Sequence, residues 1–198
     1  MFTAAEAQAA RREARERRHR TRERATITPG EVPAILANAT SPGDDLLIKL
    51  SLYAGLRLAE MDELIESDIT TRSDRHYLTA GGRVAIRTIA LPRIVGAAVE
   101  AVRPGLQPGD MLVLPQLDFE GAAARRLRAI LRAAGTTHTT AHAPRGHLFD
   151  LLGTQNDLPP AHRRAYLGVH GSDPGVLPDG WSEPIADRID ELVAPIVG

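Results

Sequence analysis

The sequence predicts a mainly α-helical fold with one small antiparallel β-hairpin or sheet. Apolar residues recur at helical spacing along most of the chain, and several of these patterns begin at residues that cap helices, such as Thr28 and Ser41. Residues 75–91 differ, because apolar and polar residues alternate there around Gly81-Gly82, which indicates strand, turn and strand. Hydrophobic residues make up 43% of the 198, enough to bury one globular core.

Individual start signals place the helices in order along the chain. Thr28-Pro29-Gly30-Glu31 has the residues of a helix start, with a threonine N-cap, a proline at the first position and a glutamate at the third. The predicted helices cover residues 29–39, 44–53, 57–65, 92–102, 118–134 and 142–152, with shorter ones at about 159–167 and 184–193. We therefore expect a basic N-terminal helix or arm (1–26), one folded domain (27–170) and a Gly/Pro-rich tail (171–198) that ends in a short helix.

Charge is distributed unevenly between the first segment and the rest of the chain. Residues 1–26 hold eight arginines and four glutamates, a net of 8 − 4 = +4, whereas the remaining residues hold 16 basic and 21 acidic side chains, a net of −5. A basic arm could lie along DNA phosphates, but a solvated helix or a disordered tail held by Glu–Arg pairs fits the same composition. The arginines that fall near one helical face, and so suit a DNA backbone, are Arg11, Arg12, Arg15, Arg18 and Arg22.

Composition excludes several classes of protein and site. The chain has no cysteine, which excludes disulfides and thiolate metal sites and is compatible with a cytoplasmic location. No apolar run approaches the roughly 20 residues of a membrane helix, so we expect no membrane partner. The histidines do not pair on one helix face with carboxylate support, and we therefore expect neither a metal nor another cofactor.

Five short segments carry recognisable motifs, and they occur in one order. They are ITPGEVPAILANA (27–39), the Gly-Leu-Arg of residues 55–57 with an acidic residue three positions on, RTIALP (87–92), HAPRGH (142–147) and YLGVHG (166–171). In this order and at these spacings they resemble the catalytic domain of the tyrosine recombinases, the phage integrase family. The resemblance extends over residues 27–170.

The resemblance implies a phosphate-binding role for a small set of residues. Arg57 and Arg145 match the two arginines that clamp the non-bridging oxygens of a DNA phosphate and stabilise the transition state. Glu60 matches the acidic residue that steadies the first arginine, and His142 matches the histidine that precedes the second. His170 lies near the histidine of the third motif, one position late because LGVH replaces Leu-Gly-His.

Two catalytic parts of the family pattern are missing from this sequence. The lysine of the β-hairpin should fall at about Gly82, but the chain has a single lysine, Lys49; the adjacent Arg83 could supply charge but is a poor proton donor. The nucleophilic tyrosine should fall at about 179–181, yet no tyrosine follows Tyr166, which we expect to pack in the core. The resemblance is therefore to a degenerate recombinase.

These observations lead to three functional hypotheses. The first is a double-stranded DNA-binding protein without catalysis, a phage or mobile-element regulator such as a repressor, which could associate with itself through the C-terminal helix. The second is an active recombinase with a displaced or partner-supplied nucleophile, and the third is a protein-interaction module, which the −5 charge of residues 27–198 would suit. Structural alternatives also remain: Arg57 as a helix-surface partner of Glu60, His142 and Arg145 as helix caps, and His170 as a surface residue.

Overall fold

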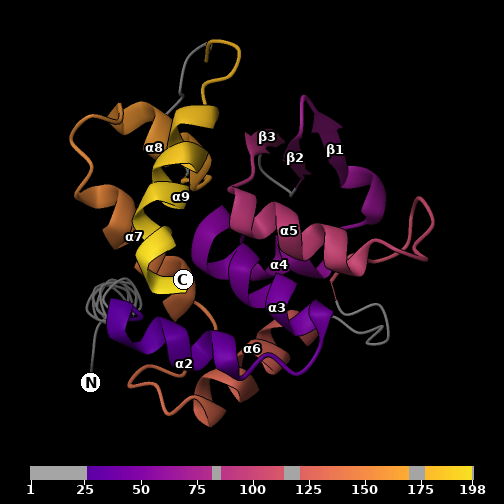
Figure 1. The fold of residues 1–198 in the computed structure, drawn as a ribbon, viewed down its shortest axis with the longest axis vertical. Coiled ribbons are helices and arrows are strands. Elements are labelled where there is room, and N and C mark those ends of the chain that lie inside the picture. The colour runs from indigo at the N-terminus through magenta and orange to yellow at the C-terminus, as the bar shows by residue number, and fades with distance from the viewer. Residues whose placement is uncertain (1–25, 82–85, 114–120, 170–176, 198) are drawn as a thin grey trace, which may run out of the picture.

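The computed structural model describes residues 26–81, 86–113, 121–169 and 177–197. In chain order its longer elements are α2 (Val32–Ala37), α3 (Pro42–Lys49), α4 (Leu58–Asp62), β1 (Ile69–Arg72), β2 (Arg75–Ala80), β3 (Arg87–Ala90), α5 (Arg93–Val102), α6 (Ala122–Ala133), α7 (Ala143–Gly153), α8 (Pro160–Tyr166) and α9 (Glu183–Val197). Figure 1 shows the small sheet beside α5, with α7, α8 and α9 grouped on the other side of the central helices. The predicted fold class, mainly α with a small antiparallel sheet, is confirmed.

The sheet has three antiparallel strands in the order β1-β2-β3, one more than the predicted hairpin. Ile69 pairs with Leu78, and Leu78 pairs with Ile89, so the three buried side chains form one row across the sheet. Ser73 and Asp74 join β1 to β2 with φ of 46° and 65°. Left-handed residues of this kind match the twist of a tight hairpin, and Asp tolerates the conformation better than most residues.

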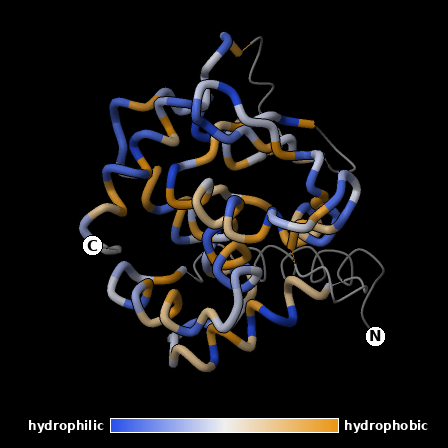
Figure 2. Tube along the Cα trace, turned by 45° about the vertical axis from the view of Figure 1, so that its right-hand side comes forward, coloured by the Kyte–Doolittle hydropathy of each residue, from blue (hydrophilic) through white to orange (hydrophobic). Residues whose placement is uncertain are grey.

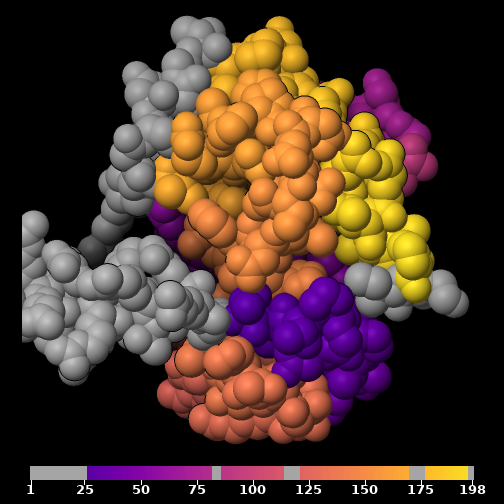
Figure 3. All heavy atoms as spheres, turned by 90° about the vertical axis from the view of Figure 1, so that its left-hand side faces the viewer, coloured from indigo at the N-terminus to yellow at the C-terminus, as the bar shows by residue number. Residues whose placement is uncertain are grey.

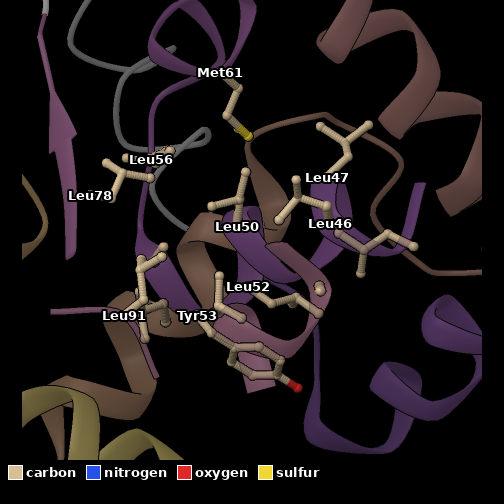
Figure 4. Packing of buried hydrophobic residues seen from close by; sticks show 14 of the residues in the cluster. Leu46, Leu47, Leu50, Leu52, Tyr53, Leu56, Met61, Leu78 and Leu91 are labelled. Atoms are coloured by element: carbon tan, nitrogen blue, oxygen red, sulfur yellow. The ribbon is translucent and has the colours of Figure 1, made fainter. Parts of the chain in front are cut away.

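The centre of the core is α3 and the π-helical turn that continues it, Leu50–Ala54. All five residues of that turn are buried, as are Leu46 and Leu47 one turn earlier. Figure 4 shows these leucines packing around the turn with Tyr53, Met61 and Leu91. Because every residue of the π-helical turn is buried, the turn runs through the middle of the domain, and Figure 2 shows many of the hydrophobic (orange) segments inside the molecule.

Helix α9 is longer than the predicted 184–193 and belongs to the same core as residues 27–170. Ile185, Ile189 and Val193 are buried in the hydrophobic cluster that α3 also enters. Figure 3 shows how α2, α7, α8 and α9, which are distant in sequence, together form one face of the molecule. The apolar side of α9 is thus covered by its own chain, so self-association through that side would require the helix to detach.

Polar side chains fix where the helices begin. Both carboxylate oxygens of Asp62 accept hydrogen bonds at the start of α6, from the backbone N–H of Gly121 (3.1 Å) and of Ala123 (2.9 Å). The predicted start at Thr28 is confirmed, since Glu31 accepts the backbone N–H and the hydroxyl of Thr28 at 2.8 Å each. Within the described residues, no helix is long and apolar enough to cross a membrane.

Candidate phosphate-binding site

Three arginines from three separate elements converge on the carbonyl end of α8. Arg87 Nε donates to the carbonyl of Tyr166 (3.3 Å), Arg145 Nη2 to that of Leu167, and Arg57 Nη2 to that of Gly168. The last carbonyls of a helix lack intrahelical partners and carry partial negative charge, which attracts cations. Arg57 and Arg145, 88 positions apart in sequence, therefore bind consecutive carbonyl groups.

The backbone of the Gly55-Leu56-Arg57 motif places the first arginine. Gly55 has a left-handed φ of 62° and ends the π-helical turn. A Cβ at this position would lie 3.0 Å from the Leu167 side chain and 3.1 Å from that of Leu148, so glycine suits both the conformation and the space. Arg145, in the first turn of α7, donates from Nε to the Gly55 carbonyl (3.0 Å) and so joins α7 to this turn.

Glu60 is the acidic centre of the site, and its side-chain partner differs from the expected one. The sequence pairs it with the Arg57 side chain, but its carboxylate binds the Arg87 guanidinium through Nη1–Oε1 (2.5 Å) and Nη2–Oε2 (3.1 Å). The Glu60 side chain is 4% exposed and that of Arg87 11%. Glu60 contacts Arg57 through the backbone, where the Arg57 N–H donates to Oε2 at 2.7 Å. It therefore holds the start of α4 rather than the first guanidinium.

The Glu60 carboxylate binds the Arg87 guanidinium and interacts through charge with those of Arg57 and Arg145. Burial alone would raise the pKa of Glu60, but hydrogen bonding and charge from Arg87, helped by Arg57, lower it, so Glu60 is ionised. Burial, followed by the positive charges of Arg57 and Arg87, lowers the pKa of Arg145 to about 10, which leaves it protonated at neutral pH. Arg57, Arg87 and Arg145 thus outweigh Glu60, and a bound anion would relieve the repulsion among them.

The two histidines of the HAPRGH motif differ in exposure, since His142 is exposed and His147 is buried. His142 is exposed at the N-cap position of α7, three residues before Arg145, and its side chain makes no capping hydrogen bond to that helix. His147 is 4% exposed and donates from Nδ1 to the Ile27 carbonyl (2.8 Å), while burial lowers its pKa. His147 is therefore a neutral, buried imidazole that joins α7 to the segment before α2. His170, Arg83 and the arm arginines (Arg11, Arg12, Arg15, Arg18 and Arg22) lie outside the described residues.

None of the chain's three tyrosines stands where a recombinase nucleophile would be expected. Tyr53 and Tyr166 are fully buried, and the Tyr166 hydroxyl donates to the carbonyls of Tyr53 (3.3 Å) and Ala90 (3.2 Å), as expected for a core residue. Burial raises the pKa of Tyr53 to about 12 and raises that of Tyr166 as well. Tyr77, on β2, donates to Glu183 Oε1 at 2.5 Å.

The segment expected to carry the nucleophile is a turn before α9. Residues 179–182 form this turn, and Trp181 is half-buried within it. The indole meets the His162 ring edge to face, with centroids 6.0 Å apart and an interplanar angle of 68°. Trp181 therefore packs against α8, and an indole cannot act as the nucleophile.

Sequence reasoning missed two sets of basic residues. Arg87 begins the motif RTIALP (87–92), but the motif gave it no role, because its partner Glu60 is 27 positions away and no local pattern connects them. On α6, Arg125, Arg128 and Arg132 are exposed and recur at helical spacing, while the intervening Arg126 turns inward to Asp44 (2.5 Å). The arginine spacing in residues 125–132 was the available signal for a basic helix face.

Solved structures of one recombinase resemble this fold. Two of them are crystal structures of the XerH site-specific recombinase, a pre-cleavage complex bound to difH substrate and a post-cleavage complex bound to palindromic difH substrate. Each aligns with a TM-score of 0.59 and 16% sequence identity over 86% of this chain, covering 54% and 50% of the respective recombinase chains. This chain thus spans about half the length of those proteins.

Comparison by sequence finds no relative. No protein-family model matches the chain, and no curated protein matches it either. At 16% identity the structural similarity concerns the fold alone, which is like that of a tyrosine-recombinase catalytic domain.

Proposed function

We propose that this protein binds double-stranded DNA through a phosphate contact made by Arg57 and Arg145, and that it does so without cleaving the strand. The observation that carries the proposal is the position of these two arginines on consecutive carbonyls of one turn. The recombinase complexes of similar fold were crystallised with difH substrate, which supports a nucleic-acid ligand for this fold.

The hydrogen-bond capacity of the two guanidinium groups suits a phosphate. Each guanidinium has five N–H donors, and the bonds made to described residues use one donor of Arg57 and two of Arg145. Protein carbonyls fix one edge of each group, so the orientation of the remaining donors is set before a ligand arrives. Arginine forks of this kind match the non-bridging oxygens of a phosphate.

The local charge favours the same ligand. The three arginines outweigh Glu60, and Arg145 and His142 lie in the first turn and at the N-cap of α7. The N-terminus of a helix carries partial positive charge that favours anions. The exposed arginines of α6 (Arg125, Arg128, Arg132) and the basic segment 1–26 could add non-specific phosphate contacts along a duplex.

The groups that family chemistry would require support the proposed absence of cleavage. Tyr53 and Tyr166 are fully buried, so neither hydroxyl can attack a phosphorus atom at the surface. Lys49, the single lysine, lies on α3 and pairs with Asp45 (2.7 Å), so it is not placed to protonate a leaving group from the hairpin. A protein that holds duplex DNA without cutting it would act as a regulator, such as a repressor.

A titration of duplex DNA at two salt concentrations tests the proposal. Arg57→Ala/Arg145→Ala should lower affinity at least about 10-fold, because each charge-assisted hydrogen bond contributes about 1.5–3 kcal/mol. Because the variant neutralises one phosphate fewer, the slope of log affinity against log salt concentration should also become shallower by about 0.9. The control, Arg93→Ala/Arg188→Ala, removes the same charge from α5 and α9 and should change affinity less than about 2-fold. Wild-type affinity in the first variant would overturn the proposal.

A further inference from the structure

The side chain of Arg87 contacts both structures that hold the phosphate-binding arginines. On one side it forms two hydrogen bonds with the Glu60 carboxylate (2.5 and 3.1 Å), and Glu60 in turn accepts the backbone N–H of Arg57. On the other side its Nε donates to the Tyr166 carbonyl at 3.3 Å. Arg87 therefore connects the start of α4 to the end of α8.

The turn after α8 is shaped around the Arg87 guanidinium. Gly168 has a φ of 60°, and a Cβ there would lie 2.8 Å from Arg87 Nη1 and 2.9 Å from Cζ. Real Cβ atoms do not approach other heavy atoms so closely, so the planar group occupies the space that a side chain at 168 would need. The carbonyls of this same turn, Leu167 and Gly168, accept the hydrogen bonds of Arg145 and Arg57.

Charge assigns different roles to the three arginines. Arg87 is 11% exposed and is bound through two of its nitrogens by a carboxylate that is itself 4% exposed. Its charge is therefore compensated inside the protein, whereas Arg57 and Arg145 bind neutral carbonyl groups. A phosphate would therefore be attracted to Arg57 and Arg145, whereas the Arg87 guanidinium is already bound to Glu60.

We propose that Arg87 is a positioning residue of this site: it does not touch DNA but sets, through Glu60 and the Gly168 turn, the geometry with which Arg57 and Arg145 bind a phosphate. The inference rests on the proposed function, and it adds that the contribution of Arg87 to DNA binding depends on Arg57 and Arg145. Removing Arg87 should weaken DNA binding only while Arg57 and Arg145 are present.

The first test is a mutant cycle in the full chain with duplex DNA. Arg87→Gln should lower affinity about 5- to 10-fold in the wild-type background and less than about 2-fold in Arg57→Ala/Arg145→Ala, because coupled residues are non-additive. Arg87→Lys keeps the charge but lacks the two parallel N–H donors that bind the Glu60 carboxylate, so it should not restore affinity. Arg75→Gln is the matched control: its side chain is 17% exposed and pairs with Asp187 on α9 instead of with Glu60 or the Gly168 turn, and its removal should leave affinity unchanged. Equal decreases from Arg87→Gln in both backgrounds, or full affinity in Arg87→Lys, would overturn the inference.

The second test needs no DNA and separates this inference from the proposed function. The Nε–H signals of Arg57 and Arg145, in protein labelled with ¹⁵N-arginine, should shift and exchange faster with water in Arg87→Gln but not in Arg75→Gln. If Arg87→Gln does not fold, Glu60→Gln/Arg87→Gln leaves no buried charge unpaired and should give the same result. Unchanged signals in the folded variant would refute the positioning role. Shifted signals in a protein that does not bind DNA would support it and refute the proposed function instead.

Discussion

Replacing Gly168 with alanine tests whether the turn after α8 is built around Arg87. A left-handed φ such as the 60° of Gly168 costs an L-residue about 1–2 kcal/mol. The added methyl would also meet the Arg87 guanidinium at 2.8 Å, and that group can yield only by loosening its bonds to Glu60. Breaking a buried ion pair completely costs about 3–5 kcal/mol, so a partial displacement adds about 1–2 kcal/mol. We expect Gly168→Ala to lower the free energy of unfolding by about 2–4 kcal/mol.

Urea unfolding of matched variants measures the two contributions separately. Gly135 has a similar φ of 68° and nothing within 4 Å of its would-be Cβ, so Gly135→Ala should show the backbone cost of about 1–2 kcal/mol alone. In an Arg87→Ala background, the further destabilisation caused by Gly168→Ala should fall to that same value, because the obstructing group is absent. Equal destabilisation by Gly135→Ala and Gly168→Ala in the wild-type background would refute the steric argument.

Three further predictions concern acid stability, the arm and the tryptophan. A hydrogen bond from Arg126 lowers the pKa of Asp44 from 3.8 to about 2, so its contribution of about 2 kcal/mol is present above pH 4 and disappears as the pH falls from about 4 to 2. Asp44→Asn should lack that contribution at neutral pH and flatten the dependence of unfolding free energy on pH between 4 and 2; a difference from wild type that persists unchanged at pH 2 would be contrary evidence. Deleting residues 1–26 should reduce DNA affinity and its salt slope, by about 0.9 for each phosphate that the arm neutralises, and an unchanged slope would show that the segment does not bind phosphates. Trp181→Phe should change DNA affinity less than about 2-fold, because the indole packs against His162 rather than at the arginine site, and a 10-fold decrease would place it in the interface.

Local patterns were sufficient to predict most of the helices. The capping residues at Thr28 and Ser41 and the proline at position 92 mark real starts, because helix termini depend on nearby hydrogen-bond partners. β1 was not predicted because Ile69 is its single buried residue and the other three are exposed polar side chains. Such a strand depends on pairing with β2, which no local alternation reveals.

Only those residues of the candidate site that belong to recognisable motifs could be predicted from the sequence. Arg57 and Arg145 follow from motifs, and the structure brings them to consecutive carbonyls of one turn, although their contact with DNA stays a prediction. The predicted side-chain partner of Glu60 was wrong, because proximity in sequence favoured Arg57 whereas the fold delivers Arg87 from β3. Long-range ion pairs depend on how strands and helices pack, and a single sequence contains no local signal for that.

The central claim is that this protein holds duplex DNA without forming a covalent bond to it. The direct measurement is incubation of the full chain with a nicked suicide duplex, followed by native and denaturing electrophoresis of the same sample. We predict a shifted complex on the native gel and no protein–DNA adduct on the denaturing gel, because no tyrosine hydroxyl is available at the arginine site in the described structure. A covalent adduct would contradict the absence of catalysis, and an unshifted duplex would contradict DNA binding itself.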